Sequence, residues 1–292
     1  MQLRHILSVC FIFFLLASGA ARGEGEKHFL WKVKSGDATM FLLGSVHVLR
    51  NDDYPLAGVI ESAYTDSDAL IVEVDTSTMN PLAIQQLSLE RGMLHDGETL
   101  ADYMSRDSFR KINALAEDLG YDMRLLSGLE PWLAAMTVIG VEAQKAGFNP
   151  ANGVDMYFIG RAAEDGKEIQ GLETAEYQIS IFDGFSRATQ EQFLLQSLEQ
   201  AKSMTSDLDK LVRIWRSGDT DALAMEMQED YDNYPEVYDK LLAERNRNWL
   251  PVILKHLQQP QTTMVVVGAL HLVGKDGIIK MLRDRGFSVT QQ

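Results

Sequence analysis

Hydrophobic positions along the chain fall into short runs near both ends and into longer helical patterns between them. Two apolar runs, 28–35 and 38–43, lie on either side of Gly36-Asp37. Gly and Asp favour a tight turn, and a tight turn between two apolar runs predicts a β-hairpin. The runs 69–74 and 262–267 are compact and rich in β-branched residues, as buried strands are. The sequence therefore predicts strands of a sheet near both ends of the chain.

The middle of the chain is predicted to be largely helical. Helical patterns dominate from about 80 to 260, with one short strand at 168–170, and the segment 276–290 adds a last helix and strand. Strands at both ends with helices between them favour one sheet closed by distant segments. We therefore expect an α/β fold in a single domain, 21–292: a mixed central sheet flanked by helices, with a large helical insertion at about 80–260.

The N-terminal residues follow the order of a secretory signal peptide. Arg4 precedes an apolar run at 6–16, and small residues follow at 17–21. The apolar run is shorter than the about 20 residues that a permanent membrane helix needs. We expect residues 1–20 to be removed, which leaves an exported protein, in the periplasm, with no permanent membrane span. A retained N-terminal anchor is the alternative.

Charge and cysteine content remove several classes of function. The formal net charge is −15 at pH 7, whereas a nucleic-acid-binding protein needs a surplus of Lys and Arg to neutralise phosphates. Cys10 is the only cysteine and lies inside the predicted signal peptide. The mature protein would therefore have no disulfide and no cysteine nucleophile. Any metal site in it must be built from His, Asp and Glu.

A G-x-x-H segment occurs twice, ending at His47 and at His271, and each copy follows a predicted strand. Glu73 lies at the end of another apolar strand, and Glu173 lies just beyond a short one. Ligand sites in open α/β sheets form outside the carboxyl ends of the strands. If the strands are parallel neighbours, these four side chains converge on one crevice.

Two imidazoles with carboxylates can bind a divalent metal ion in an open coordination sphere. They can equally serve as a general base and its orienting partner without a metal. A single G-x-x-H occurs often by chance, and it is the repetition after two strands that makes this pair a candidate site. Ser186, in a sequence like a degraded nucleophile elbow, follows an apolar run at 179–182 that could be a strand; we interpret Ser186 as a helix N-cap instead.

Taken in order, these motifs resemble those of the TraB/PrgY/GumN family, from about residue 29 to residue 289. The motifs that carry the resemblance are Gly44 to His47, the Glu73 strand, Gly153-Val154-Asp155, Gly171-Leu172-Glu173-Thr174, Glu244-Arg245-Asn246-Arg247 and Val265 to Leu272. The family includes the animal Tiki proteins, regarded as metal-dependent proteases, and it is related to the erythromycin-esterase and ChaN-like fold. The resemblance implies that His47, Glu73 and His271 line the active centre, and that Arg245 contributes to it.

The first hypothesis is a metal-dependent hydrolase, most simply a peptidase. The resemblance implies that His47 and His271 bind a divalent ion such as Mn or Co, with Glu173 as a further ligand unless it serves as a hinge or helix cap. Glu73 would be a third ligand or the base for the water that the ion activates. Arg245 would stabilise negative charge on the substrate carbonyl oxygen.

Two other hypotheses stay open. In one, the same crevice holds a peptide or small ligand without catalysis, as a pheromone-sequestering protein would. In the other, the acidic stretch at 222–232, with Glu229, Asp230 and Asp232, is a docking surface for an envelope partner. The sequence predicts a peptide or small-molecule substrate and no nucleic acid, and it leaves the oligomeric state undetermined.

Overall fold

Six strands form one mixed sheet in the computed structural model, which describes residues 27–95 and 97–292. The strands are β1 (Leu30–Ser35), β2 (Ala38–Ser45), β3 (Ala69–Val74), β4 (Glu168–Glu173), β5 (Thr262–Gly268) and β6 (Val289–Gln291). Their order across the sheet is β4-β3-β5-β2-β1-β6. The expected α/β fold with a mixed central sheet flanked by helices is therefore confirmed.

The four strands that carry the candidate residues are parallel. In the sheet, β5 lies between β3 and β2 and is parallel to both, and β4 is parallel to β3 on the other side. Ser45 is the register partner of Gly268, so the two G-x-x-H segments leave the sheet side by side. The carboxyl ends of β2, β3, β4 and β5 consequently share one edge of the sheet.

The remaining two strands are antiparallel and complete the other side of the sheet. Strand β1 pairs with β2 through a tight turn, as the hairpin prediction has it, and Gly36 takes a positive φ of 58° there. Strand β6 pairs antiparallel to β1. The two ends of the described chain therefore meet at this edge.

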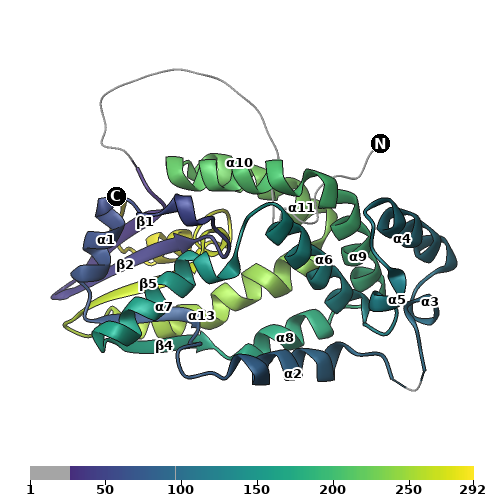
Figure 1. Ribbon diagram of the computed structural model, residues 1–292. Coiled ribbons are helices and arrows are strands. Elements are labelled where there is room, and N and C mark those ends of the chain that lie inside the picture. The colour runs from purple at the N-terminus through teal and green to yellow at the C-terminus, as the bar shows by residue number, and fades with distance from the viewer. Residues whose placement is uncertain (1–26, 96) are drawn as a thin grey trace.

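Helices cover both faces of the sheet and build the rest of the molecule. Those closest to the strands are α1 (Gly58–Thr65), α7 (Val154–Asp165), α10 (Met204–Ser217), α13 (Glu244–His256) and α14 (Ile278–Arg283). Figure 1 shows α7 across the sheet, α10 along its upper side, and α13 passing from the sheet toward the helical half. Because α13 spans both halves, it can bring side chains to the carboxyl edge of the strands.

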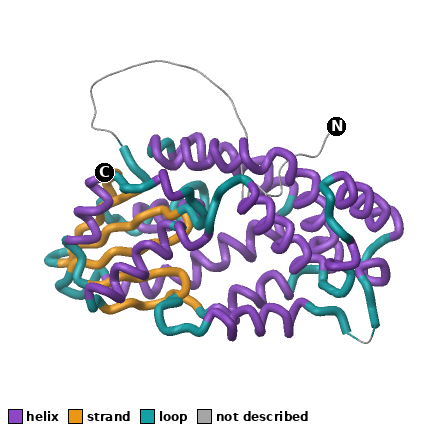
Figure 2. The backbone as a smooth tube through the Cα atoms, in the orientation of Figure 1, coloured by secondary structure: helices purple, strands orange, loops and turns teal. Residues whose placement is uncertain are grey.

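The helical half lies at the carboxyl end of the parallel strands. It contains α2 (Pro81–Gly92), α3 (Leu100–Tyr103), α4 (Arg106–Asp118), α5 (Met123–Leu126), α6 (Pro131–Lys145), α8 (Ala175–Asp183), α9 (Arg187–Gln200), α11 (Thr220–Asn233) and α12 (Pro235–Tyr238). Figure 2 shows the strands gathered at one end of the molecule and these helices at the other. Between β3 and β5 the described chain is helical except for β4 and connecting loops.

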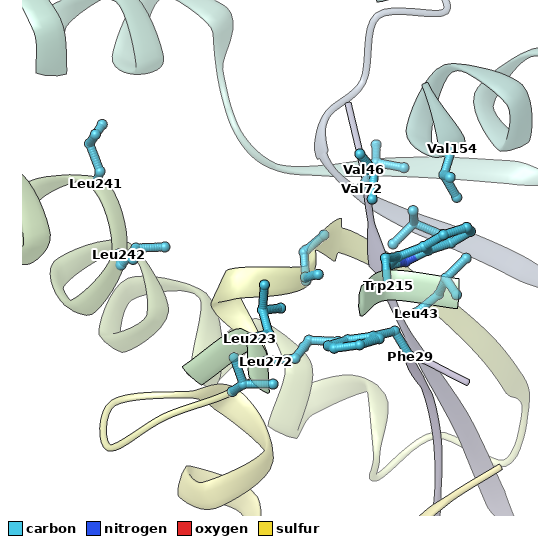
Figure 3. Close-up of a cluster of buried hydrophobic side chains, with 14 of the residues drawn as sticks. Phe29, Leu43, Val46, Val72, Val154, Trp215, Leu223, Leu241, Leu242 and Leu272 are labelled. Atoms are coloured by element: carbon cyan, nitrogen blue, oxygen red, sulfur yellow. The ribbon is translucent and has the colours of Figure 1, made fainter. Parts of the chain in front are cut away.

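The core beside β2 ties α10 to the sheet. Leu43 is fully buried, and Trp215 from α10 lies close to it and to Phe29 (Figure 3). The indole Nε1 of Trp215 donates a hydrogen bond of 2.6 Å to the carbonyl oxygen of Gly44. The first G-x-x-H segment is therefore anchored from behind by a buried aromatic residue.

Some sequence predictions lie outside the described residues. The predicted signal peptide, 1–20, is among them, and so are the side chains at 227–233, which include Glu229, Asp230 and Asp232. The apolar run 179–182 is part of helix α8, so the idea that it could be a strand is wrong.

In residues 27–95 and 97–292, no helix has the length and apolar character needed to cross a membrane.

Candidate functional site

Glu73 lies between the two G-x-x-H histidines at the carboxyl edge of the sheet. His47 follows β2, His271 ends the 3-10 turn Ala269–His271 that follows β5, and Glu73 is the penultimate residue of β3. The distance from Glu73 Oε1 to His47 Nε2 is 3.9 Å, and to His271 Nε2 it is 3.8 Å. The structure therefore brings these three predicted residues together around one carboxylate oxygen.

Gly268 forms the floor beneath these three side chains. Its amide donates a hydrogen bond of 2.7 Å to Glu73 Oε1. A Cβ at this position would lie 3.3 Å from both Glu73 Oε1 and His47 Nε2, and 3.5 Å from Cδ2 of His271. The glycine of the second motif thus leaves open the space that all three side chains face.

Gly44, the glycine of the first motif, has a different role. A Cβ there would lie 2.8 Å from the Cα atom of Ala269, a backbone atom that cannot move aside easily. Without a side chain, Gly44 lets the two motifs pack directly on each other. The repeated motif therefore reflects two physical needs, close backbone packing at Gly44 and open space at Gly268.

Arg245, from the first turn of α13, contacts Glu73, Glu173 and His271, and its side chain is 8% exposed. Its Nη2 donates to Glu73 Oε2 at 2.5 Å and to Glu173 Oε1 at 2.7 Å, and its Nε donates to Glu173 at 3.1 Å. Its Nη1 lies 3.0 Å from the Leu241 carbonyl oxygen and 3.0 Å from His271 Nε2. A guanidinium has five N–H groups, one on Nε and two on each Nη. The contacts just described give each of them a partner within the protein.

Glu173, the last residue of β4, faces Arg245 and not the histidines. Its side chain is 5% exposed, and Trp249 Nε1 donates to its Oε2 at 2.9 Å. The Trp249 ring also lies 4.3 Å from the His271 ring, centroid to centroid. Glu173 and Trp249 therefore form the wall behind Arg245 and His271.

His271 is held from both sides of its ring. Its Nδ1 lies 2.7 Å from Asn246 Oδ1, on the same helix as Arg245. The Asn246 Nδ2 group donates to the carbonyl oxygens of His271 and Asp276 at 3.1 and 2.8 Å. The ring is 5% exposed, so its orientation is set by these protein contacts.

His47 is held more loosely and faces solvent. Its Nδ1 lies 3.2 Å from Asp155 Oδ1, in the first turn of α7, and its side chain is 59% exposed. Glu73 is only 10% exposed, and Gln178 of α8 donates to its Oε2 at 3.1 Å. The site therefore has an open side at His47 and a buried side at Glu73, His271 and Arg245.

The pKa values of the two histidines are shifted in opposite directions. The protein packed around His47 acts to lower its pKa, but the carboxylates of Asp155 and Glu73 outweigh this and raise the pKa to about 9. For His271, burial and the positive charge of Arg245 lower the pKa to about 3. Burial alone would raise the pKa of Glu73, yet Arg245 and the two histidines hold it well below its usual range. His271 is therefore neutral and Glu73 ionised near pH 7.

A family comparison agrees with the order of these motifs. The model of the TraB/PrgY/gumN family matches residues 29–291. The chain belongs to this family. All the side chains of the site lie within the matched segment, and the family prediction made from the sequence is confirmed.

Three curated relatives, each an uncharacterized protein, match most of this chain. The chain is 26% identical over 280 residues to the uncharacterized protein YbaP of Escherichia coli K12, which covers 90% of this chain and 96% of YbaP. YbaP of Shigella flexneri matches to the same extent. An uncharacterized protein of Treponema pallidum is 22% identical over 275 residues, covering 89% of this chain and 81% of that protein. No solved structure matches the chain.

Several side chains of the site had no assigned role in the sequence. Asp155 and Asn246 stood in motifs of the family resemblance, but their sequence neighbours do not reveal which histidine each one holds. Trp249 is buried, as a packing residue would be, but it also donates a hydrogen bond to Glu173. Gln178 carried no signal at all. Ser186 accepts from the amide of Thr189, which confirms the N-cap interpretation.

The donors at the site suit a divalent ion in kind, and their spacing is slightly wide. Imidazole nitrogen and carboxylate oxygen are ligands of ions such as Mn and Co. Donors about 2.1 Å from a tetrahedral ion lie about 3.4 Å from one another, compared with 3.8 and 3.9 Å here. Among the described residues, no group of three or more His, Asp or Glu side chains is arranged to hold an ion as it stands. Binding would require His47, Glu73 and His271 to close over Gly268, with His271 Nε2 released from Arg245.

Proposed function

We propose that this chain is an exported, metal-dependent hydrolase that cleaves peptide bonds at the edge of the sheet beside His47. The observation that supports it best is the placement of both G-x-x-H histidines within 4 Å of one ionised carboxylate oxygen, over a glycine that leaves their shared space open. Peptides are chosen as substrates because of the resemblance to the Tiki proteins, and export because of the N-terminal sequence.

In this proposal His47, His271 and Glu73 hold a divalent ion such as Mn or Co. Glu73 Oε1 accepts one hydrogen bond, from Gly268, and so keeps one lone pair that faces both imidazoles. Glu73 Oε2 already accepts from Arg245 and Gln178. We therefore assign Glu73 as the third ligand. Such an ion would supply Lewis acidity, which lowers the pKa of a water molecule and polarises a substrate carbonyl.

The side chains around these ligands set the direction of approach. His47 is the most exposed of them, so substrate enters from its side, while Trp249 and Glu173 close the opposite side. Burial of Glu73 and His271 excludes water from the rear of the site and strengthens the electrostatic interactions there.

Arg245 acts in this proposal as the residue that positions Glu73. All five of its N–H groups have partners in the structure, and only the one facing His271 Nε2 would be freed when that nitrogen binds an ion. Glu173 in turn positions Arg245, so we assign it to the support of the site and place it outside the ligand set. Direct stabilisation of the substrate carbonyl by Arg245 stays a prediction of the sequence.

The test is peptide cleavage by the purified mature protein with and without Mn or Co. We expect cleavage that needs the ion, that a chelator abolishes, and that is lost in His47→Ala and His271→Ala. His95→Ala replaces an exposed histidine elsewhere and serves as the matched control. Cleavage that stays at the wild-type level after chelator treatment and in both site variants would overturn the proposal.

A binding protein without catalysis is the second candidate. It is favoured by one observation: Arg245 already occupies the His271 lone pair that a metal would need. In that case an added peptide would be recovered intact in complex with the protein, and binding would be unchanged by chelators. Recovery of cleaved peptide would exclude this second candidate.

A further inference from the structure

We propose that Asn246 is a positioning residue that holds His271 as the Nδ1-protonated tautomer and thereby directs the Nε2 lone pair into the site. The use of this lone pair as a metal ligand rests on the proposed function, whereas the tautomer itself does not. The argument needs only the hydrogen bonds on the two sides of one buried ring.

The first step is the orientation of the Asn246 amide. An amide NH2 can only donate and the amide oxygen can only accept. Two carbonyl oxygens, of His271 and Asp276, lie 3.1 and 2.8 Å from Nδ2. They require the NH2 group on that side, because an amide oxygen there would face two other oxygens. The Oδ1 atom must then face His271.

The second step is the proton on the ring. Oδ1 of Asn246 lies 2.7 Å from His271 Nδ1, and an oxygen acceptor at this distance needs a hydrogen on the nitrogen. A neutral imidazole carries one N–H, so Nε2 is left as an acceptor. Arg245 Nη1, which can only donate, lies 3.0 Å from Nε2, so that nitrogen carries no hydrogen and the ring is neutral.

The third step is an independent contact on the far side of the ring. Arg245 Nη1 lies 3.0 Å from His271 Nε2, and a guanidinium can only donate. An Nε2-protonated ring would place two hydrogens against each other here and two acceptors against each other at Asn246. Both neighbours therefore select the same tautomer, and Asn246 is the one that gives its proton a partner.

The hydrogen bond between Asn246 and His271 resembles those that commonly hold metal-ligating histidines from outside the ligand set. Such a partner binds the ring N–H opposite the ligating nitrogen, fixes the tautomer and orients the ring. His47 has a related contact from Asp155, but its ring is 59% exposed and open to solvent exchange. His271 is buried, and the partner of its Nδ1 proton is a single side chain, Asn246.

Two substitutions separate positioning from structural support. Asn246→Leu removes both the acceptor for Nδ1 and the donor to the two carbonyls. Asn246→Asp keeps an acceptor for Nδ1 but loses that donor. Both variants should therefore unfold more easily than wild type, whereas only Asn246→Leu should change the tautomer. Asn248→Leu, at an exposed position on the same helix, is the matched control.

The measurement is the 15N chemical shift of the histidine ring nitrogens in chelator-treated protein at pH 7, with His271 assigned from the spectrum of His271→Gln. We expect a protonated Nδ1 and an unprotonated Nε2 in wild type, in Asn246→Asp and in Asn248→Leu. A population with protonated Nε2 should appear in Asn246→Leu. A protonated Nε2 in wild type, or an unchanged tautomer in Asn246→Leu, would overturn the proposal.

A second readout links the tautomer to the proposed function. Mn or Co affinity should fall about 10- to 100-fold in Asn246→Leu, as is common when an outer-shell partner is lost, and should be better retained in Asn246→Asp. If wild type binds no metal, the proposed function fails while the ring shifts still decide the role of Asn246. If metal binds but affinity is equal in Asn246→Leu and wild type, the positioning role is contradicted.

Discussion

Nη1 of Arg245 lies 3.0 Å from Nε2 of His271, the nitrogen that a metal ion would use. The same guanidinium binds Glu73 and Glu173, so one cation connects both carboxylates to the second G-x-x-H motif. This places Arg245 at the centre of the buried half of the site. Its hydrogen bonds give both of these buried carboxylates a cationic partner.

Arg245→Met should destabilise the protein by about 3–5 kcal/mol, because it leaves two buried carboxylates without their cation. Urea unfolding at pH 7 measures this free energy. Arg247→Met is the control: Arg247 lies two residues further along the same helix, and its pair with Asp239 is about half exposed. We expect that variant to lose at most about 1 kcal/mol. Similar losses in the two variants would contradict the role given to Arg245.

Gly268→Ala should fold but lose metal binding and hydrolysis. The backbone at Gly268 has φ −48° and ψ 135°, which alanine can adopt, so folding should be largely kept. The added Cβ would stand 3.3 Å from both Glu73 Oε1 and His47 Nε2, in the space the ion would need. Gly58→Ala, where a Cβ meets nothing within 4 Å, is the control. Metal titration and peptide cleavage should distinguish the two, and full activity in Gly268→Ala would show that this space is not used.

Acid should weaken the contribution of Glu73 to stability. Its folded-state pKa is below the ordinary 4.5, so the stabilisation is fully present above about pH 4.5 and is lost as the pH falls toward the folded-state value. Glu73→Gln lacks this titration. The difference in unfolding free energy between wild type and Glu73→Gln should therefore shrink between pH 6 and pH 3, as measured by urea unfolding. A constant difference over that range would mean that the Glu73 pKa is not lowered by folding.

Asp155→Asn should lower the pKa of His47. The carboxylate of Asp155 is the main group that raises this pKa to about 9, and an amide has no charge with which to do so. A titration of the His47 ring by NMR should show the midpoint falling toward the ordinary 6.5. Asp53→Asn, at a carboxylate that lies six residues after His47 but pairs with Arg216, should leave that midpoint in place. An unchanged midpoint in Asp155→Asn would contradict the contact between these two residues.

The fold was largely predictable because strand signals are local. The run 69–74 was predicted with the observed bounds, since compact apolar β-branched runs have few alternatives. Strand β4 was predicted too short, ending at 170, because Gly171 and two acidic residues weaken the local pattern while pairing with β3 sustains the strand to Glu173. The sheet order could not be predicted, because β5 reaches its central place through contacts between residues almost 200 positions apart.

The site residues at the ends of strands could be predicted from the sequence, whereas the contacts of those on helices could not. His47, Glu73 and His271 stand at the ends of strands, and parallel pairing alone brings them together. Asp155 and Asn246 come from α7 and α13, whose packing onto the sheet sets their partners. No local pattern reports such packing, so their contacts with the two histidines became visible only in the folded chain.

The most direct test of the account is calorimetric titration of the chelator-treated mature protein with Mn and with Co. The account predicts one bound ion per chain in wild type and in His95→Ala, and loss of binding in His47→Ala, His271→Ala and Glu73→Gln. Wild-type protein that binds neither ion, or binding that persists unchanged in all three site variants, would contradict the claim that these residues form one metal centre.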